Sequence, residues 1–442
     1  MGIKVPLIRV TPPGPKARAI IALDERYLAR STKTAPVVVR RAQGAIVEDV
    51  DGNLLIDFTS GVSVLNVGHS HPKVLAAVTA QAKDHMHFAG TDFYYASQAR
   101  LAERLAKLAP GKRARKVFFT NSGTEATEAA IKASRVHTRR GMFLAFLKAF
   151  HGRSMGALGL TASKAVQRRG YTPMMPAATH VPYAYCYRCP YHLTYPSCDL
   201  HCANVIEDVY FKTVAPPEDV AAVFVEPVQG EGGYVVPPKG WMERIAAIAK
   251  GHGILLVDDE VQAGMGRTGR FFAIEHTKAV PDILTMAKAL GGGLPLGAAV
   301  MDASLDFPEA GSHSTTFGGN AVACAAGEAV LDVFEAEDVL RNATRLGAHL
   351  GKRLDEMAAT REIMGDNRGL GLMRATEFIT DARTRKPNPR VRDAIVKEAC
   401  RRGLMLLPCG DSSLRYIPPL TIPREHLDAG LDVLEAAIDA CG

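Results

Sequence analysis

The segment from about residue 72 to residue 320 alternates short apolar runs with longer helical stretches, and this alternation most constrains the fold. Residues 253–257 (Gly-Ile-Leu-Leu-Val) have the length and the β-branched, apolar composition of a buried strand. Strands that alternate with helices pack as a mainly parallel sheet with helices on both faces. We therefore predict an α/β fold in which ligands bind beyond the carboxyl ends of the strands.

The two flanks of this segment have a different pattern. At 442 residues the chain is long for one core, because domains usually hold roughly 100–200 residues. Residues 45–57 indicate two short strands around an Asp-Gly-Asn turn, and beyond Asn320 the pattern is helical through Met357 and then mixed. We predict that residues 1–70 and 326–442 form a smaller α+β domain, beside a large domain of residues 71–325.

Composition excludes several classes of protein. The apolar fraction of 47% and the charged fraction of 22% are those of an ordinary globular protein. The formal charge of +7 comes from scattered basic residues, which favours attraction of small anions over nucleic-acid binding. No apolar run approaches the ~18 residues of a membrane span. The opening residues 1–8 are too few and too soon polar for a signal peptide, so we expect a cytoplasmic protein.

Lys288 is the first candidate for chemistry. It follows the apolar residues 281–287 and precedes the glycine-rich residues 291–297. Partial desolvation lowers the pKa of such a lysine and makes its amine available for a Schiff base, as in pyridoxal-phosphate enzymes. The alternative interpretation is a surface lysine at the end of a segment.

Acidic residues follow the predicted strand of residues 253–257. A carboxylate at the carboxyl end of a strand can pair with a protonated pyridine nitrogen, which keeps the ring an electron sink. Asp258 and Asp259 are both candidates, because adjacent strand residues face opposite ways. The other aspartate would be a solvated or capping carboxylate.

A phosphate site is indicated at residues 121–126 (Asn-Ser-Gly-Thr-Glu-Ala), which open a helical stretch. Ser122 and Glu125 have the spacing of a capping box, and Gly123 permits close approach of the backbone. Free N–H groups and the helix dipole then favour an anion there. A plain helix cap without a ligand is the alternative.

Together these residues resemble the class III, ω-amino-acid aminotransferases of the fold type I pyridoxal-phosphate superfamily. The resemblance extends from about Gly44 to Leu420 and is greatest to 4-aminobutyrate aminotransferases. Its landmarks, in chain order, are residues 121–126, 150–153, 226–233, 259–269, 288 and 316–320. The resemblance implies a large domain with a mainly parallel sheet and a smaller α+β domain built from both chain ends.

The resemblance also implies the cofactor site. Lys288 would be the Schiff-base lysine and proton shuttle, and Asp259 the pyridinium partner. Gln262 would bond the phenolic oxygen, and Phe150 would stack on the ring unless it is an ordinary core aromatic. Thr316 would reach the phosphate of the neighbouring subunit, which implies a homodimer or a dimer of dimers with shared active sites. The implied cofactor-binding residues are Ser122, Gly123, Thr124, Phe150, His151, Glu226, Asp259, Gln262, Lys288 and Thr316.

Arginines, whose planar fork suits carboxylates, determine the predicted substrate. By resemblance, Arg415 clamps the α-carboxylate of an amino or keto acid, and Glu231 pairs with Arg415 when the donor carries its amine at the far end. Arg153 would meet the distal carboxylate of 4-aminobutyrate. The sizes of Val62 and Phe88 would select among donors.

The predicted reaction is a ping-pong transfer of the amino group from an ω-amino acid, with 4-aminobutyrate preferred, to 2-oxoglutarate, giving an aldehyde and glutamate. Ornithine and acetylornithine are variants served by the same glutamate and arginine. A second hypothesis is an amino-acid racemase or epimerase, in which the α-proton returns to the opposite face. A third, a pyridoxal-binding regulator, would need a DNA-binding module for which the chain leaves no room.

A cysteine segment departs from the family pattern and resembles segments of archaeal members, which include both aminotransferases and racemases. Its four cysteines are Cys186, Cys189, Cys198 and Cys202. Their spacing suits zinc, a small iron–sulfur cluster, two disulfides, or free thiols in a structured loop, and we assign no metal ligand. Asp258 and Ala263 are lesser departures, where the family commonly has an uncharged residue and a small hydroxyl residue.

Overall fold

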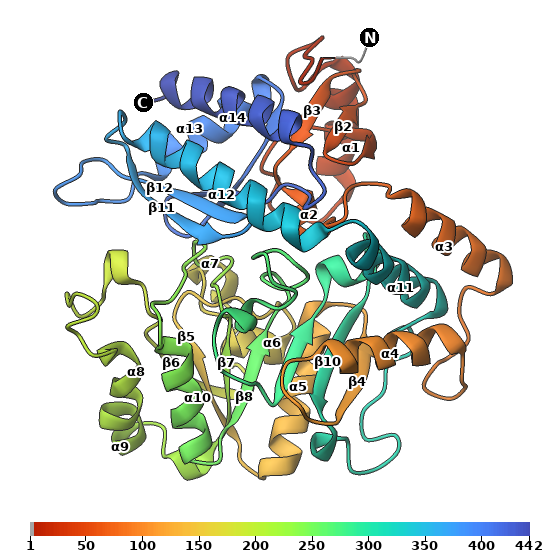
Figure 1. The fold of residues 1–442 in the computed structure, drawn as a ribbon, viewed down its shortest axis with the longest axis vertical. Helices are drawn as coiled ribbons and strands as arrows, with labels where there is room; N and C mark the ends of the chain where they lie inside the picture. The colour runs from red at the N-terminus through yellow and green to blue at the C-terminus, as the bar shows by residue number, and fades with distance from the viewer. Residues whose placement is uncertain (1–3) are drawn as a thin grey trace.

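The computed structural model describes residues 4–442, so the first three residues of the opening segment considered for a signal peptide lie outside the described residues. In Figure 1 the large sheet occupies the lower half of the molecule and both chain ends lie in the upper half. The large sheet has the strand order β4-β10-β9-β8-β7-β5-β6. Its strands are β4 (Arg115–Thr120), β5 (Met142–Phe146), β6 (Ala177–Val181), β7 (Val220–Val225), β8 (Leu255–Asp259), β9 (Ile283–Met286) and β10 (Gly297–Asp302).

Strands β6, β5, β7, β8 and β9 run parallel, and β10 is antiparallel to both β9 and β4. The predicted mainly parallel sheet is therefore confirmed. Every residue of β7 is buried, as expected for a strand covered on both faces.

Helices cover the two faces of this sheet. On one face α5 (Gly123–Thr138) packs its alanines against Phe143, Phe224 and Val257, and on the other α10 (Trp241–Gly251) packs in the core that contains Val223 and Leu256. The alternation of Val257 and Leu256 between faces follows from the period of two along a strand. Other helices near the sheet are α3 (Pro72–Asp84), α4 (Ala96–Leu108), α6 (Met155–Leu160), α7 (Ala165–Arg168), α8 (His201–Val205), α9 (Phe211–Thr213) and α11 (Ala321–Ala336).

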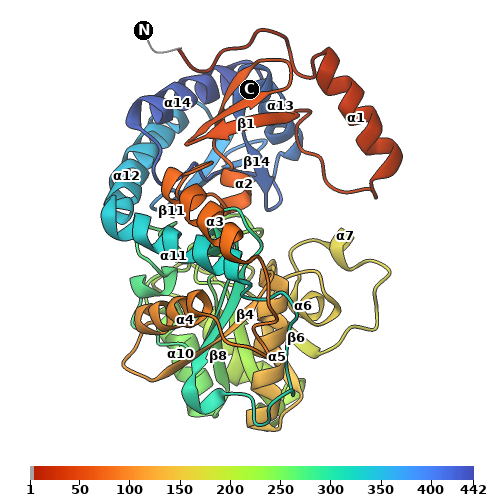
Figure 2. The same ribbon diagram turned by 90° about the vertical axis from the view of Figure 1, so that its right-hand side faces the viewer.

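A separate smaller domain joins the two ends of the chain. Its first sheet, β1-β2-β3-β13, pairs β3 in parallel with β13, and its second, β11-β12-β15-β14, is antiparallel. The strands are β1 (Val39–Gln43), β2 (Ile46–Asp49), β3 (Leu54–Asp57), β11 (Met364–Leu370), β12 (Met373–Phe378), β13 (Leu404–Met405), β14 (Leu407–Cys409) and β15 (Ser413–Tyr416). The helices are α1 (Pro15–Tyr27), α2 (Ser60–Ser63), α12 (Val339–Ala358), α13 (Pro389–Arg401) and α14 (Arg424–Asp439), with α1 extending to one side in Figure 2. The boundaries at residues 70 and 325 stay a prediction.

Three expectations about elements can be compared with the structure. The turn predicted within residues 45–57 is confirmed, since β2 and β3 pair antiparallel around it. The strand predicted at residues 253–257 begins two residues later, because Gly253 has a φ of +62° and belongs to the preceding turn. The helical stretch after Asn320 is two helices, separated where Asp338 has a φ of +47°.

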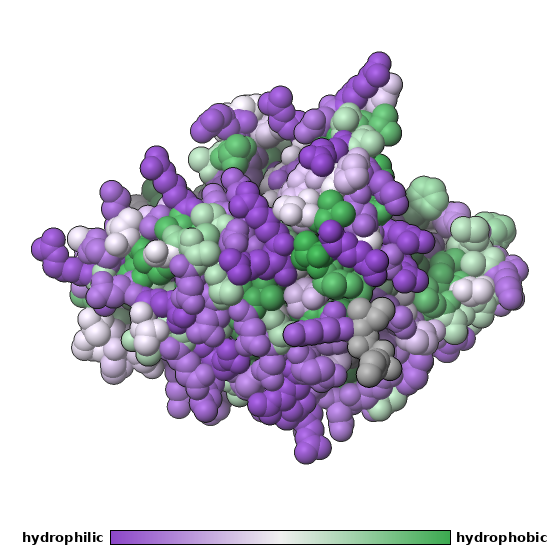
Figure 3. Space-filling model, turned by 90° about the horizontal axis from the view of Figure 1, so that it is seen from above, coloured by the Kyte–Doolittle hydropathy of each residue, from purple (hydrophilic) through white to green (hydrophobic). Residues whose placement is uncertain are grey.

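Hydrophilic side chains cover much of the face seen from above, with apolar residues interspersed in small groups (Figure 3). Within residues 4–442, no helix combines the length and the apolar character needed to cross a membrane.

Candidate active site

A cavity of about 430 Å³ lies at the carboxyl ends of the parallel strands. Phe150 and His151 follow β5, Glu226 follows β7 directly, Asp259 ends β8 and Lys288 follows β9, and all of them line the cavity. Since parallel strands present their carboxyl ends at one edge, residues far apart in sequence converge there.

Lys288 lies two residues beyond β9 and begins a short 3-10 turn, η5 (Lys288–Gly291), with a φ of +48°. Left-handed backbone at a lysine costs of order 1–3 kcal/mol and is found preferentially at functional sites. Burial lowers the pKa of Lys288 to about 8, against the opposing effect of the Asp259 charge. A larger fraction of its amine is therefore unprotonated near neutral pH, which suits a nucleophile or a base.

Asp259 is the aspartate that faces the cavity. It shares a face of β8 with Val257, beneath α5, whereas Asp258 shares the other face with Leu256. Asp259 Oδ2 lies 2.6 Å from Nδ1 of the buried His151. Burial alone would lower the pKa of His151, but the hydrogen bond and charge of Asp259 outweigh it and raise the pKa.

Asp258 forms a buried carboxyl pair with Glu260. Within residues 4–442, neither carboxylate oxygen of Asp258 has a hydrogen-bond partner. Burial and the neighbouring charge of Glu260 raise the pKa of Asp258 well above its usual range, and burial raises that of Glu260 to about 7. Sequence reasoning did not single out Glu260, although its place directly after two aspartates was a signal that three carboxyls would lie together.

The amino end of α5 opens into the same cavity. Ser122 Oγ accepts a hydrogen bond from Glu125 N at 3.4 Å, which is half of the predicted capping box. The carboxylate of Glu125 instead accepts from Asn121 N at 2.7 Å, so the reciprocal half lies one residue earlier than predicted. A Cβ added to Gly123 would lie 2.8 Å from Val261, so a glycine is needed for this approach.

The hydroxyl of Thr124 is already engaged within the protein. Its Oγ1 accepts from the backbone N–H groups of Arg153 at 3.1 Å and Ser154 at 3.0 Å. Both bonds use the oxygen as an acceptor, so its O–H can still donate, either to Ser154 Oγ at 2.7 Å or to a phosphate. The hydroxyl fixes the turn that carries Arg153.

Phe150 and Arg153 form part of the cavity wall. The Arg153 guanidinium lies 5.5 Å from the centroid of the Phe150 ring. Glu226 fixes this wall, because its carboxylate accepts from Phe150 N at 3.0 Å and from Gly230 N at 2.8 Å. Burial raises the pKa of Glu226 to about 7.

Glu231 and Arg415, which we call the gate, lie close together although β15 and the turn after β7 are far apart in sequence. Arg415 Nη1 lies 3.3 Å from Glu231 Oε2, and Lys164 Nζ lies 2.6 Å from Glu231 Oε1. Burial would raise the pKa of Glu231, but the charges of Arg415 and Lys164 outweigh it and lower the pKa. Lys164 was missed by sequence reasoning, because it lies in a polar stretch that has no motif.

Gln262 connects the gate to the cavity. Its Oε1 accepts from Tyr234 Oη at 2.8 Å and from Arg415 Nη1 at 3.5 Å. The Nε of Arg415 is buried without a partner among the described residues. The buried guanidinium therefore keeps an unsatisfied donor, as a carboxylate-binding arginine requires.

Five predicted residues do not line the cavity, namely the gate residues Glu231 and Arg415, and Val62, Phe88 and Thr316. Val62 has a φ of +67° and is 37% exposed, and the wall position is taken by Val64 instead. Phe88 and Thr316 are exposed, and the predicted contact of Thr316 with a neighbouring subunit stays a prediction.

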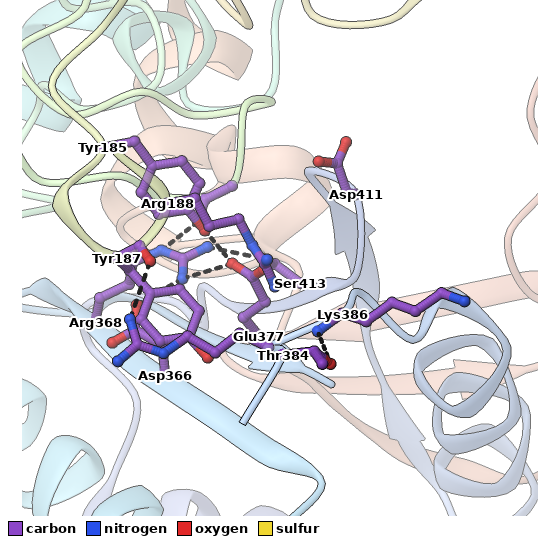
Figure 4. Close-up of polar contacts among 12 residues, drawn as sticks. Tyr185, Tyr187, Arg188, Asp366, Arg368, Glu377, Thr384, Lys386, Asp411 and Ser413 are labelled. Carbon is purple, nitrogen blue, oxygen red and sulfur yellow. Dashed lines mark hydrogen bonds and ion pairs between the residues drawn. The ribbon is translucent and has the colours of Figure 1, made fainter. Parts of the chain in front are cut away.

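Arg368, on β11, supports the turn that carries the gate glutamate, and Figure 4 shows it beside Ser413, Asp366 and Glu377. Its Nε donates to the backbone oxygen of Gly233 at 2.9 Å, and its Nη2 donates to Ser413 Oγ at 2.8 Å. Its Nη1 binds the carboxylates of Asp366 at 2.8 Å and Glu377 at 3.0 Å. The turn after β7 and the strand of Arg415 are therefore held by one guanidinium.

The cysteine segment contacts the same group. Tyr185 Oη and Arg188 Nε both donate to the carboxylate of Glu377 (Figure 4). The segment's cysteines, Cys186, Cys189, Cys198 and Cys202, line a cavity of about 20 Å³ as free thiols. Across residues 4–442 no group of three or more His, Cys, Asp or Glu side chains is arranged to hold a metal ion.

The cavity residues fit pyridoxal phosphate. A lysine with a lowered pKa, a carboxylate held by a buried histidine and a helix amino end lie around one space of about 430 Å³. These groups match an aldehyde, a pyridine nitrogen and a phosphate, respectively. Gly123, where a Cβ would meet Val261, preserves the space at the phosphate end.

Comparison with known proteins gives concordant results. The family model described as Aminotransferase class-III matches residues 27–438. The chain is 40% identical to the 5-aminovalerate aminotransferase DavT of Pseudomonas aeruginosa, over 91% of this chain and 94% of that protein. It is 38% identical to the probable 4-aminobutyrate aminotransferase of Bacillus subtilis, over 90% and 92%. It is also 40% identical to the leucine/methionine racemase of Thermococcus litoralis, over 91% of both chains.

Among solved structures, the thermostable (S)-enantioselective ω-transaminase of Thermomicrobium roseum superimposes with a TM-score of 0.90. The two chains are 30% identical, and the match covers 96% of this chain and 99% of the other. The match extends over both domains, so the predicted fold type I is confirmed.

Proposed function

The chain belongs to the class-III aminotransferases, whose cofactor is pyridoxal phosphate, and we propose that it moves the amino group of an ω-amino acid to 2-oxoglutarate. We favour 4-aminobutyrate as the donor, with its longer homologue 5-aminovalerate as a close alternative. The observation that supports this most directly is the contact of Glu231 with Arg415, because a neutralised Arg415 suits a donor with one carboxylate. Relatives named for both donors add support.

When bound, the cofactor supplies an electron sink that stabilises negative charge at the carbon next to the reacting nitrogen. Lys288, with a pKa of about 8, accepts a proton from that carbon and returns it. Asp259, oriented by His151 at 2.6 Å, would hold a proton on the pyridine nitrogen. Gln262 Nε2 would donate to the phenolic oxygen, since its Oε1 already accepts from Tyr234.

The donor binds in one orientation. Arg153, exposed at the cavity wall, takes the single carboxylate and leaves the terminal amine at Lys288. Glu231 meanwhile pairs with Arg415, so this guanidinium is not free to take a second carboxylate. In the second half-reaction the α-carboxylate of 2-oxoglutarate takes Arg415 in place of Glu231, while its distal carboxylate takes Arg153.

We also propose that the enzyme works as a homodimer or a dimer of dimers in which Thr316 completes the phosphate site of the partner. The exposure of Thr316 in a single chain supports this proposal. Light scattering of the purified enzyme, together with loss of cofactor affinity in Thr316→Val, tests it. A fully active monomer would contradict it.

The experiment for the main proposal is glutamate formation from 2-oxoglutarate with 4-aminobutyrate, 5-aminovalerate or ornithine as the donor. We expect 4-aminobutyrate to be consumed faster than ornithine, and the Lys288→Ala variant to be inactive with each. Consumption of 4-aminobutyrate no faster than in Lys288→Ala would overturn the proposal.

A second candidate is an amino-acid racemase or epimerase, favoured by 40% identity to the leucine/methionine racemase. A racemase needs no keto acid, because Lys288 and a second proton donor would exchange the α-proton across the two faces. Inversion of a single enantiomer in the absence of any keto acid would support it. Inversion that depends on added keto acid would leave transamination as the activity.

A further inference from the structure

Glu231 is bound by two cations at once. Lys164 Nζ lies 2.6 Å from Oε1 and Arg415 Nη1 lies 3.3 Å from Oε2, so each cation has its own carboxylate oxygen. From these contacts, and resting on the proposed function, we infer that Lys164 is a positioning residue of the gate. It retains Glu231 when Arg415 turns to the α-carboxylate of the keto acid.

The need for such a residue follows from burial. The side chain of Glu231 is only 16% exposed, and Arg415 is buried. Breaking a buried ion pair by removing one partner is strongly unfavourable, because an uncompensated charge is left behind. If Arg415 were the sole partner of Glu231, every turnover would have to create that state.

Lys164 is placed to prevent it. Its backbone is extended and precedes α7, whose first turn is fixed by a hydrogen bond from Gln167 N to Lys164 O at 3.0 Å. Its side chain is 38% exposed, so the ammonium keeps contact with water while it holds the carboxylate. The anchored backbone and the long side chain let Nζ follow Glu231 away from Arg415.

The same contact weakens the closed gate. Arg415 contacts only Oε2 while Lys164 holds Oε1, so the pair lacks the bidentate geometry that is the strongest arrangement available to an arginine and a carboxylate. Lys164 therefore acts in both states, since it stabilises Glu231 in the open gate and limits its hold on Arg415 in the closed one. Both effects favour dicarboxylate binding over monocarboxylate binding.

The test is calorimetric titration of the holoenzyme with two unreactive ligands. Glutarate has carboxylates for both Arg153 and Arg415 and requires an open gate, whereas butyrate has one carboxylate and leaves the gate closed. In Lys164→Gln we expect glutarate to bind about 10-fold more weakly and butyrate to bind within twofold of the parent. Lys164→Arg, which keeps the charge, should recover most of the glutarate affinity.

Lys148→Gln is the matched control. Lys148 is exposed to a similar degree, 35%, and its Nζ also forms a 2.6 Å ion pair, but with Asp411. We expect this variant to bind glutarate like the parent. In a Glu231→Gln background, Lys164→Gln should have no further effect, because there is no carboxylate left to retain.

Arg415→Gln separates the role of Lys164 from the role of the gate itself. If it weakens glutarate while Lys164→Gln does not, the inference about Lys164 is overturned and the gate stands. If Arg415→Gln leaves glutarate binding unchanged, the proposed gate itself fails. If Lys164→Gln weakens glutarate and butyrate equally, Lys164 acts as a general attractor of anions and the positioning role is overturned.

Discussion

The cofactor end of the cavity and the gate are built in different ways. Asp259 and Lys288 lie at the ends of neighbouring strands of one sheet, and His151 follows a third strand of it. Glu231 lies in the turn after β7, whereas Arg415 lies on β15 of the smaller domain. Arg368 binds both the turn and the strand. The positions of the residues in the first region follow from the topology of one sheet. The second joins side chains from separate parts of the chain, and the proposed function needs them to change partners between a monocarboxylate and a dicarboxylate.

The largest effect should come from Lys288. Lys288→Ala removes the amine that we propose attaches the cofactor and moves the proton, so we expect kcat to fall by at least ~10³-fold with every donor. Single-turnover absorbance measures this loss. Lys148→Ala, which removes a lysine outside the cavity, should keep activity near the parent level. Retained turnover in Lys288→Ala would contradict the assignment of Lys288 as the lysine that binds the cofactor.

The two adjacent aspartates give the next test. Asp259→Asn removes the charge that contacts His151 and that, in the proposed function, stabilises the protonated ring nitrogen. We expect the rate constants of both half-reactions to fall by about 10²–10³-fold. Asp258→Asn, on the opposite face of β8, should change kcat by less than ~10-fold. Equal losses in the two variants would contradict the separation of the two faces.

The gate should respond in only one half-reaction. Arg415→Gln removes charge-assisted bonds to the α-carboxylate, each of about 1.5–3 kcal/mol, so kcat/KM for 2-oxoglutarate should fall by about 100-fold. The value for 4-aminobutyrate should change by less than ~5-fold, because Arg415 does not bind this donor. Stopped-flow measurement of each half-reaction checks this difference between the two substrates. Equal losses of kcat/KM for 2-oxoglutarate and 4-aminobutyrate would contradict a separate role for the gate.

The smallest expected effect is on stability, through Asp258 and Glu260. Their folded-state pKa values are raised, so the folded protein binds protons that the unfolded chain has released. This contribution is complete below the unfolded pKa values near 4 and is lost as pH rises through about 7. We expect Tm to fall by a few degrees from pH 5 to pH 8 in the parent, and by less in Asp258→Asn. Identical slopes in calorimetric scans would contradict a buried pair that holds a proton.

The sequence was sufficient for the cofactor end because short-range pattern and strand topology determine it. An apolar run followed by acidic residues placed Asp259, and a lysine between an apolar run and glycines placed Lys288. The residue pattern left Asp258 and Asp259 open and the resemblance favoured Asp259, and the register of β8 gives the physical reason, since it fixes the face that each side chain takes. The capping box was half correct, because Glu125 reaches Asn121 rather than Ser122.

The gate was less accessible from the sequence. Glu231 and Arg415 were found only through resemblance, and Lys164 not at all, because contacts across 67 residues of chain leave no periodic signal. Val62 lies outside the cavity of this chain and Val64 lines it, in a segment where Gly61 and Val62 have left-handed backbone. The wall of the cavity therefore depended on backbone conformations that composition does not predict.

The most direct test of the central claim is the visible spectrum of the holoenzyme mixed with 4-aminobutyrate alone, followed by product analysis after 2-oxoglutarate is added. We predict that the cofactor absorbance band is lost with 4-aminobutyrate and returns with 2-oxoglutarate. One glutamate should form for each cofactor molecule whose absorbance returns. A band that persists with every ω-amino acid, while a single-enantiomer α-amino acid is inverted without any keto acid, would contradict the account.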